Sequence, residues 1–173
     1  GKMGYVEISF AVQNVILVSL FLIRRQHTGL DSNLLHQGVA VIAFFSGLAF
    51  IGQPATASHT EQMVSNGVTL AANILSILTL INLGRSFGVL IAFRKIETRG
   101  LYSVVRHPMY LADILFRIGF IISHLNWFTS VLFVVSSACY LYRALLEEKF
   151  LGQQTEYREY MNRVKYRFVP FIY

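Results

Sequence analysis

The sequence predicts an all-α fold: an integral membrane bundle of about five transmembrane helices. Of the 173 residues 54% are apolar and only 14% are charged, and the mean hydropathy is +0.52. Soluble domains contain about 45–50% apolar and about 25% charged residues. The apolar residues also form stretches close to the roughly 20 residues that a spanning helix needs. This length and the single cysteine predict one membrane domain, residues 1–173, with no disulfide within the chain.

Three apolar stretches fill the first half of the chain. The first expected helix covers residues 5–23 and stops at Arg24 and Arg25, where charge replaces the apolar pattern. The second covers residues 34–52 and ends before Pro54. A polar loop, residues 55–62, separates it from the third expected helix, residues 64–83. No catalytic motif is evident within residues 1–83.

Two further helices are expected in the second half. Pro108 opens the fourth, which extends to about residue 123, because proline is well suited to the first turn of a helix. Residues 124–126 form a tight turn, and the fifth helix covers about residues 127–146. The remainder, residues 147–173, is polar and amphipathic.

The basic residues predict how the bundle is oriented. All Lys and Arg except Lys2 and Arg117 follow the first or third helix or lie at the end of the fifth helix and in the tail, which an odd number of spans places on one side of the membrane. Basic residues concentrate on the cytoplasmic side. We therefore expect the N-terminus outside and the C-terminus in the cytoplasm, in the plasma (inner) membrane. Because the positive charge flanks apolar stretches, the net charge of +6 does not indicate nucleic acid binding.

Residues 100–112 form the first stretch that carries chemical information. Gly100 permits a close approach of the backbone to a ligand. Arg106 and His107 precede Pro108 at a helix N-terminus, where free N–H groups favour a carboxylate or phosphate. An interfacial anchor that contacts lipid headgroups would use the same residues. The stretch alone therefore leaves a binding site and an anchor open.

Two later stretches contain charged residues near the end of the fifth helix and in the tail. Arg143 and Glu147 are four residues apart and can pair on one helix face. Glu147 and Glu148 point about 100° apart on a helix, so they are expected to have different roles. The tail, residues 157–170, is basic with interspersed aromatic residues. A solvated helix end and a membrane-surface helix are the structural alternatives for these stretches.

Taken in order, these stretches resemble the isoprenylcysteine carboxyl methyltransferase and phospholipid methyltransferase superfamily. The match consists of Gly-Leu-Tyr-x-x-Val-Arg-His-Pro-Met-Tyr-Leu at residues 100–111, then Glu147-Glu148-x-x-Leu151, Tyr157-x-x-Tyr160, and an Arg-x-x-Pro that ends at Pro170. It covers about residues 83–170. Residues 84–173 are thus the expected cofactor-binding half, whereas the first two helices are similar in hydropathy alone.

The resemblance implies a methyltransferase that uses S-adenosyl-L-methionine. Gly100, Tyr102, Arg106, His107 and Tyr110 would line the methionine part of this methyl donor. Glu147 and Glu148 would bind its ribose, while Tyr157, Tyr160 and residues 167–170 would close over the adenine. The candidates for catalysis are His107, Glu148 and Arg167.

Asp113 and Arg117 lie within the fourth apolar stretch. Because isolated charges are costly in a membrane, we expect these two residues, four apart, to pair with each other. The pair would be structural or would contact the head group of the acceptor. Asp113 and the Pro170-Phe171 ending also faintly resemble membrane steroid reductases that use NADPH. A non-enzymatic membrane partner with the same fold is a further alternative.

The expected acceptor is an amphiphilic or lipid-like molecule that enters from the bilayer. A prenylated cysteine, a phospholipid amine, an isoprenoid and a small xenobiotic all fit. A carboxylate or thiolate acceptor needs no general base, whereas a neutral acceptor would use His107 or Glu148. The five histidines show no paired ligand spacing, so no metal is expected.

Overall fold

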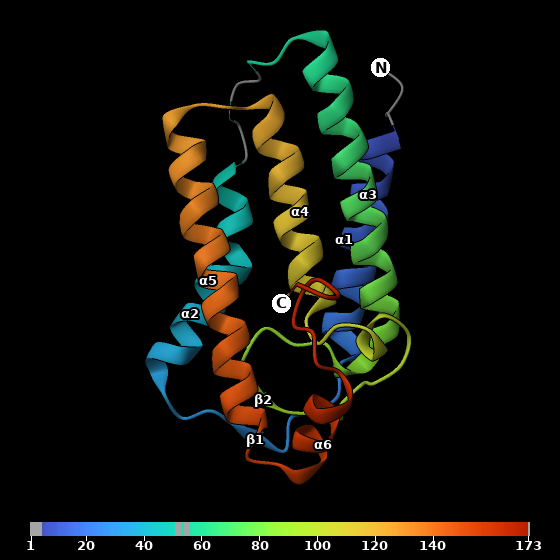
Figure 1. The fold of residues 1–173 in the computed structure, drawn as a ribbon, viewed down its shortest axis with the longest axis vertical. Helices are drawn as coiled ribbons and strands as arrows, with labels where there is room; N and C mark the ends of the chain where they lie inside the picture. Colours follow the sequence, from blue (N-terminus) through green and yellow to red (C-terminus); the bar gives the residue numbers. More distant parts are fainter. Residues whose placement is uncertain (1–4, 51–52, 54–55, 173) are drawn as a thin grey trace.

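The computed structural model describes residues 5–50, 53 and 56–172. Five α-helices lie side by side along the long axis of the molecule (Figure 1): α1 (Tyr5–Ile23), α2 (Leu34–Phe45), α3 (His59–Leu83), α4 (Pro108–Ser123) and α5 (Trp127–Leu151). A shorter helix, α6 (Thr155–Arg163), lies at one end of the bundle. The predominantly helical fold is confirmed.

The helices carry apolar surfaces suited to lipid. Among the described residues, two helical stretches are long and apolar enough to cross a membrane, residues 59–86 and α5. Residues 8–23 and 34–50 form shorter apolar helices. Large apolar side chains such as Leu22, Leu34 and Ile81 are mostly exposed. Exposed apolar surface on this scale is rare in soluble monomers, so it supports the membrane character of the chain.

The first and fourth expected helices are confirmed, whereas the boundaries of the second and third differ from expectation. The α-helical part of the second ends at Phe45 and continues as a 3₁₀ helix, η1 (Ser46–Phe50). Gly52, its expected last residue, lies outside the described residues. The third helix begins at His59 instead of residue 64. Ser58 accepts a hydrogen bond from the Glu61 backbone N–H, and the Glu61 carboxylate accepts one from the Ser58 backbone N–H. This capping box stabilises an earlier start.

The fifth helix is longer than expected and ends at Leu151 instead of residue 146. Glu147 and Glu148 therefore belong to the helix and not to the polar tail. Both carboxylates have cationic partners: Arg143 contacts Glu147, while Arg106 contacts Glu148. These ion pairs offset the cost of placing two adjacent carboxylates at a membrane helix end, and the helix continues through them.

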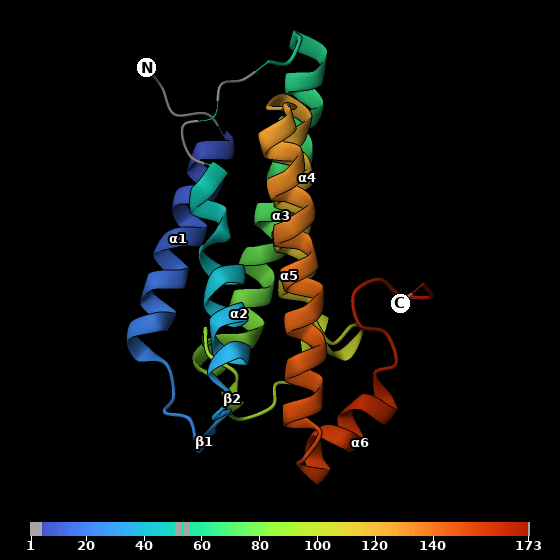
Figure 2. The same ribbon diagram turned by 90° about the vertical axis from the view of Figure 1, so that its left-hand side faces the viewer.

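A two-stranded antiparallel sheet, which the sequence did not predict, closes the α6 end of the bundle. Strand β1 (Gly29–Leu30) pairs with β2 (Ala92–Phe93), and both lie at the same end as α6 in Figures 1 and 2. The buried Gln37 side chain extends this pairing. Its Nε2 donates to the Ile91 carbonyl oxygen at 2.9 Å, and its Oε1 accepts from the Ile91 N–H at 3.0 Å. The α1–α2 connection is thereby attached to the loop that follows α3.

Helices α3 and α4 approach closely at Gly119 of α4. The Ser65 hydroxyl donates to the Gly119 carbonyl oxygen at 2.7 Å. A Cβ at position 119 would overlap the Thr69 hydroxyl and lie 2.9 Å from the Thr69 backbone nitrogen. Small residues are what permits such close helix contacts in membranes.

We predict that Gly119→Ala destabilises the bundle by about 1–3 kcal/mol, because backbone atoms of α3 cannot move away cheaply. The matched control is Gly67→Ala on α3, where an added Cβ meets nothing within 4 Å. That change should be neutral or stabilise by up to about 1 kcal/mol. Thermal unfolding in detergent measures both, and equal melting temperatures for the two variants would contradict the packing account.

Candidate active site

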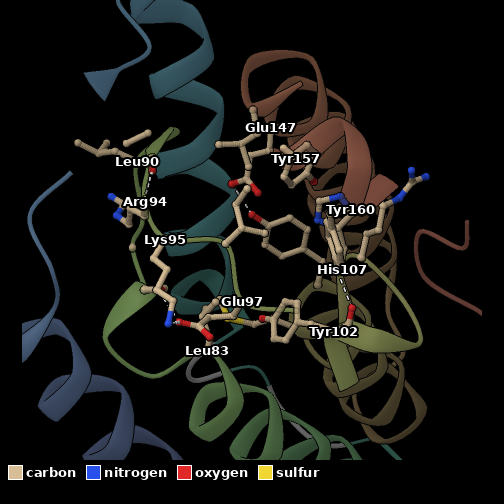
Figure 3. A pocket seen from close by; sticks show the side chains of 18 residues that line it. Leu83, Leu90, Arg94, Lys95, Glu97, Tyr102, His107, Glu147, Tyr157 and Tyr160 are labelled. Carbon is tan, nitrogen blue, oxygen red and sulfur yellow. Dashed lines mark hydrogen bonds and ion pairs between the residues drawn. The ribbon is translucent and has the colours of Figure 1, made fainter. Parts of the chain in front are cut away.

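A pocket opens at the α6 end of the bundle. It contains about 820 Å³ of empty space when the solvent-filled mouth is included. Its walls come from the loop after α3, the start of α4, the end of α5 and α6. Figure 3 shows Arg94 and Lys95 on one side, Tyr102, His107 and Tyr160 on the other, and Glu147 between them. Two short 3₁₀ helices, η2 (Gly84–Ser86) and η3 (Gly100–Ser103), contribute to the loop.

Glu147 is held in one orientation within this pocket. Its Oε1 accepts a hydrogen bond from the Tyr110 hydroxyl at 2.5 Å and one from Arg143 Nε at 3.1 Å. The expected pairing of Arg143 with Glu147 is confirmed. Arg143 is almost fully buried, and it also donates to the carbonyl oxygens of Ala40 and Val89. Both contacts to Glu147 use Oε1, so among the described residues no hydrogen bond engages Oε2.

Glu148 has a different environment, as the helical geometry predicts. It is buried and does not line the pocket. Its Oε1 lies 3.0 Å from Arg106 Nε and 3.1 Å from His107 Nε2, and its Oε2 accepts a hydrogen bond from Arg167 Nε at 2.9 Å. The three residues expected to be catalytic, His107, Glu148 and Arg167, therefore lie together. The anionic group that meets Arg106 and His107 is a carboxylate of the chain itself.

The backbone of the C-terminal tail also contacts the segment before α4 that contains the sequence motif, residues 100–107, called the motif loop below. The N–H groups of Arg106 and His107 donate to the carbonyl oxygens of Tyr166 and Arg167 at 2.9 and 2.8 Å. The Tyr160 hydroxyl of α6 donates to the Tyr102 carbonyl oxygen at 2.7 Å. The tail thus forms one wall of the pocket.

Three buried tyrosines give this wall a neutral, aromatic character. Burial raises the pKa of Tyr102 and Tyr157 well above the usual value, and nearby carboxylates add to the effect for both. The pKa of Tyr160 is also raised, chiefly by burial. These phenols remain protonated, so they can stack on a ligand or donate hydrogen bonds but cannot act as bases.

The structure brings most of the predicted site residues to the pocket. Those that line it are Tyr102, Arg106, His107, Tyr110, Glu147, Tyr157 and Tyr160. Gly100, Glu148 and Arg167 do not. Gly100 has φ +57°, and a Cβ there would overlap the Asn82 side chain at the end of α3. Glycine is therefore needed at this position for a left-handed turn against α3, and not for an approach to the pocket.

The expected ion pair between Asp113 and Arg117 is not among the ion pairs of the described residues, and this prediction is corrected. Arg117 Nη1 donates to the Asp113 backbone carbonyl oxygen at 2.9 Å, and Nη2 donates to the Ser46 hydroxyl at 2.9 Å. The guanidinium also lies 4.7 Å from the centre of the Tyr140 ring. The helix geometry brings Arg117 back onto its own backbone, and these partners engage both of its Nη atoms instead of the Asp113 carboxylate. Neither Asp113 nor Arg117 lines the pocket.

The loop after α3 contributes pocket residues that the sequence did not single out. The polar ones are Ser86, Arg94, Lys95 and Glu97, and the apolar ones include Leu83, Leu90 and Ala92. In the sequence this loop indicates membrane orientation through its basic residues, and it lies within the stretch that resembles the superfamily, but no role was assigned to these side chains. The available signal was Gly88, shortly before Arg94, in a stretch that mixes apolar residues with charges of both signs. A glycine followed at short range by charged residues is compatible with a binding loop, but it also occurs in ordinary turns.

Comparison with known proteins identifies the kind of membrane protein to which this arrangement belongs. Residues 61–158, more than half of the chain, match the model of the phospholipid methyltransferase family. The chain belongs to the phospholipid methyltransferase family. A curated relative, Protein-S-isoprenylcysteine O-methyltransferase B of Arabidopsis thaliana, is 32% identical over 145 residues, which cover 78% of this chain and 68% of the relative.

Membership of the phospholipid methyltransferase family confirms the resemblance that the motifs indicated. The chain is a membrane methyltransferase, similar to isoprenylcysteine carboxyl methyltransferases. These matches favour the methyltransferase over the reductase and over a non-enzymatic partner. The matched region includes α3, α4, α5 and the start of α6, which are the elements that enclose the pocket.

We predict that Glu148→Gln loosens the tail and destabilises the chain. Removing the negative charge leaves Arg106 and Arg167 without their shared carboxylate and weakens the contact with His107, and breaking a buried pair costs about 3–5 kcal/mol. Limited trypsin digestion should cut faster at Arg163, Lys165 and Arg167, and the melting temperature should fall. Glu159→Gln, an exposed position on α6, is the matched control. Digestion at the control rate would contradict a docking role for Glu148.

Proposed function

We propose that this protein transfers a methyl group from S-adenosyl-L-methionine to an amphiphilic, lipid-like acceptor at the cytoplasmic face of the membrane. The observation that carries the proposal is the position of Glu147. Its carboxylate faces the pocket and is fixed by Tyr110 and Arg143. A fixed carboxylate beside aromatic side chains suits a ribose with an attached adenine.

The residues of the pocket fit such a donor. Glu147 Oε2 is available to accept ribose hydroxyls, and Tyr157 offers a buried aromatic face. The pocket is concave and combines apolar, aromatic and charged side chains, as small-molecule sites do. When bound, S-adenosyl-L-methionine supplies an activated methyl group on its sulfonium. The chain then has to supply proximity, orientation and exclusion of water.

The cluster around Glu148 would hold the motif loop in place during the reaction. Glu148 contacts Arg106, His107 and Arg167, so we propose that it positions His107 at the pocket wall. A histidine oriented by a carboxylate is suited to accept a proton from a neutral acceptor. A carboxylate acceptor would need no such step. With the guanidinium groups of Arg106 and Arg167 beside it, Glu148 is itself a poor proton acceptor.

The lining also favours an acceptor with an apolar part. Apolar surface in the pocket comes from Leu83, Leu90, Ile96, Met109 and Leu151. The adjoining helices expose large apolar side chains, which suit contact with lipid tails. An acceptor could therefore keep its tail among the helices while its head enters the pocket. Because Asp113 and Arg117 do not line the pocket, a structural role suits them better than contact with the acceptor head.

We further propose five membrane spans, with the N-terminus outside and the C-terminus in the cytoplasm of the plasma (inner) membrane. The spans would be α1, α2 with η1, α3, α4 and α5. The α6 end of the bundle carries the basic loop and tail, including Arg94, Lys95 and Arg163. This distribution supports a cytoplasmic location for the pocket by the positive-inside rule.

We predict that purified protein in detergent binds S-adenosylhomocysteine with micromolar affinity and that Glu147→Gln weakens it. Losing a charged hydrogen-bond partner costs roughly 1.5–3 kcal/mol, or about 10–150-fold in affinity. Isothermal titration measures the affinity, and Glu159→Gln again serves as the control. Equal affinities for wild type and Glu147→Gln would refute the assignment of Glu147. No binding to the wild type would refute the proposed donor.

We predict that, in intact cells, a reagent that cannot cross the membrane labels a cysteine at one end of the bundle but not a cysteine at the other end. In a Cys139→Ser background, Thr60→Cys at the start of α3 should react with a membrane-impermeant maleimide from outside. Gln153→Cys, after α5, should react only once the membrane is permeabilised. Both positions are exposed on the protein, so which of them the impermeant reagent reaches from outside the cell depends on the orientation of the bundle in the membrane. The reverse pattern would overturn the proposed orientation.

A further inference from the structure

Arg94 lies in the pocket wall and was not among the predicted site residues. Its Nη1 donates to the Leu90 carbonyl oxygen at 3.0 Å, which directs the guanidinium along the loop (Figure 3). Gly88 makes this position possible, because a Cβ at residue 88 would overlap the guanidinium. The local sequence therefore provides a space that the Arg94 side chain occupies at the edge of the pocket.

Arg94 differs from the other arginines around the pocket. Arg143 pairs with Glu147, and both Arg106 and Arg167 pair with Glu148. Within the described part of the chain, no carboxylate lies within ion-pair distance of Arg94, and this is what sets it apart. Its buried Nε also has no hydrogen-bond partner; Arg106 Nε has none either, but it lies 3.0 Å from the Glu148 carboxylate. Burial lowers the pKa of Arg94, and the charge of Glu147 only partly opposes this effect.

The neighbouring residue, Lys95, does have a carboxylate partner, unlike Arg94. Lys95 Nζ lies 3.9 Å from Glu97, whose carboxylate also accepts a hydrogen bond from the Ser86 hydroxyl. Lys95 is mostly exposed, so water and Glu97 both stabilise its charge. Arg94 is more buried and has neither a carboxylate nor full hydration. A partly buried guanidinium with unused donors is suited to a planar anion, which it can bind through two parallel hydrogen bonds.

We infer that Arg94 binds a carboxylate group of the ligand in this pocket. The inference rests on the proposed function and adds to it a residue that recognises an anion. Two molecules could supply the carboxylate: the methionine part of the donor, or an amphiphilic acceptor with a free acid head. Either would replace the carboxylate partner that Arg94 lacks within the described part of the chain.

The first arm of the test concerns the donor. Affinities are measured by isothermal titration for S-adenosylhomocysteine and for S-adenosyl-3-thiopropylamine, which lacks only the carboxylate. If the donor is the source, Arg94→Gln should weaken S-adenosylhomocysteine by about 10–150-fold while changing the decarboxylated ligand little. Gly88→Ala should act in the same direction, because it displaces the guanidinium without removing its charge. Arg99→Gln, an exposed residue outside the pocket, is the charge-matched control.

The second arm concerns the acceptor. N-acetyl-S-farnesylcysteine and its methyl ester differ by one free carboxylate, and their affinities are measured on the same variants in detergent. If the acceptor supplies the carboxylate that Arg94 binds, the wild type should bind the free acid more tightly than the methyl ester. Arg94→Gln should remove this difference in affinity, while its affinity for S-adenosylhomocysteine stays unchanged. Arg99→Gln should keep the wild-type preference.

The outcomes separate this inference from the function on which it rests. A wild type that does not bind S-adenosylhomocysteine refutes both. If the wild type binds S-adenosylhomocysteine, but Arg94→Gln and Gly88→Ala keep the wild-type preference for the carboxylate-bearing ligand in both arms, the inference is overturned. The proposed function then still stands. Melting temperatures near that of the wild type show that the two variants remain folded.

Discussion

The contact on which the site depends is the buried Glu148 carboxylate with its three partners, two arginines and one histidine. Arg106 and His107 come from the loop before α4, and Arg167 comes from the tail, so one side chain joins three segments. A buried carboxylate is costly without partners, and so are the buried cations without it. The arrangement is therefore stable only when all three segments are in place. Backbone hydrogen bonds from Arg106 and His107 to the tail reinforce it.

The helical geometry of α5 gives its two adjacent carboxylates separate roles. Successive residues of a helix point about 100° apart. Glu147 consequently faces the pocket, where Tyr110 and Arg143 fix it, whereas Glu148 faces the motif loop and the tail. Extending α5 to Leu151 is what places both residues on a rigid element. A site held on a helix keeps its geometry better than one held on a loop.

The helices without sequence motifs also support the pocket. Arg143 reaches from α5 to the Ala40 carbonyl oxygen of α2 and the Val89 carbonyl oxygen of the loop. Gln37 of α2 forms two hydrogen bonds with Ile91 of the same loop. The wall that contains Arg94 is thus supported by α2, although α2 contributes no described side chain to the pocket. Family motifs alone give no indication of this support.

The sequence by itself determined the membrane character, the bounds of α1 and α4, the family, and the pairing of Arg143 with Glu147. The family came from the resemblance of its motifs, and the others depend on composition, on local periodicity or on partners one helical turn apart. A linear pattern contains all of these. Tertiary structure decided that Glu148 binds Arg106 and Arg167, that Gly100 packs against α3, that β1 pairs with β2, and that Arg117 bonds to backbone and Ser46 instead of the Asp113 carboxylate. The reason is that these contacts join segments distant in sequence, or depend on competing partners that only the packed helices bring within reach.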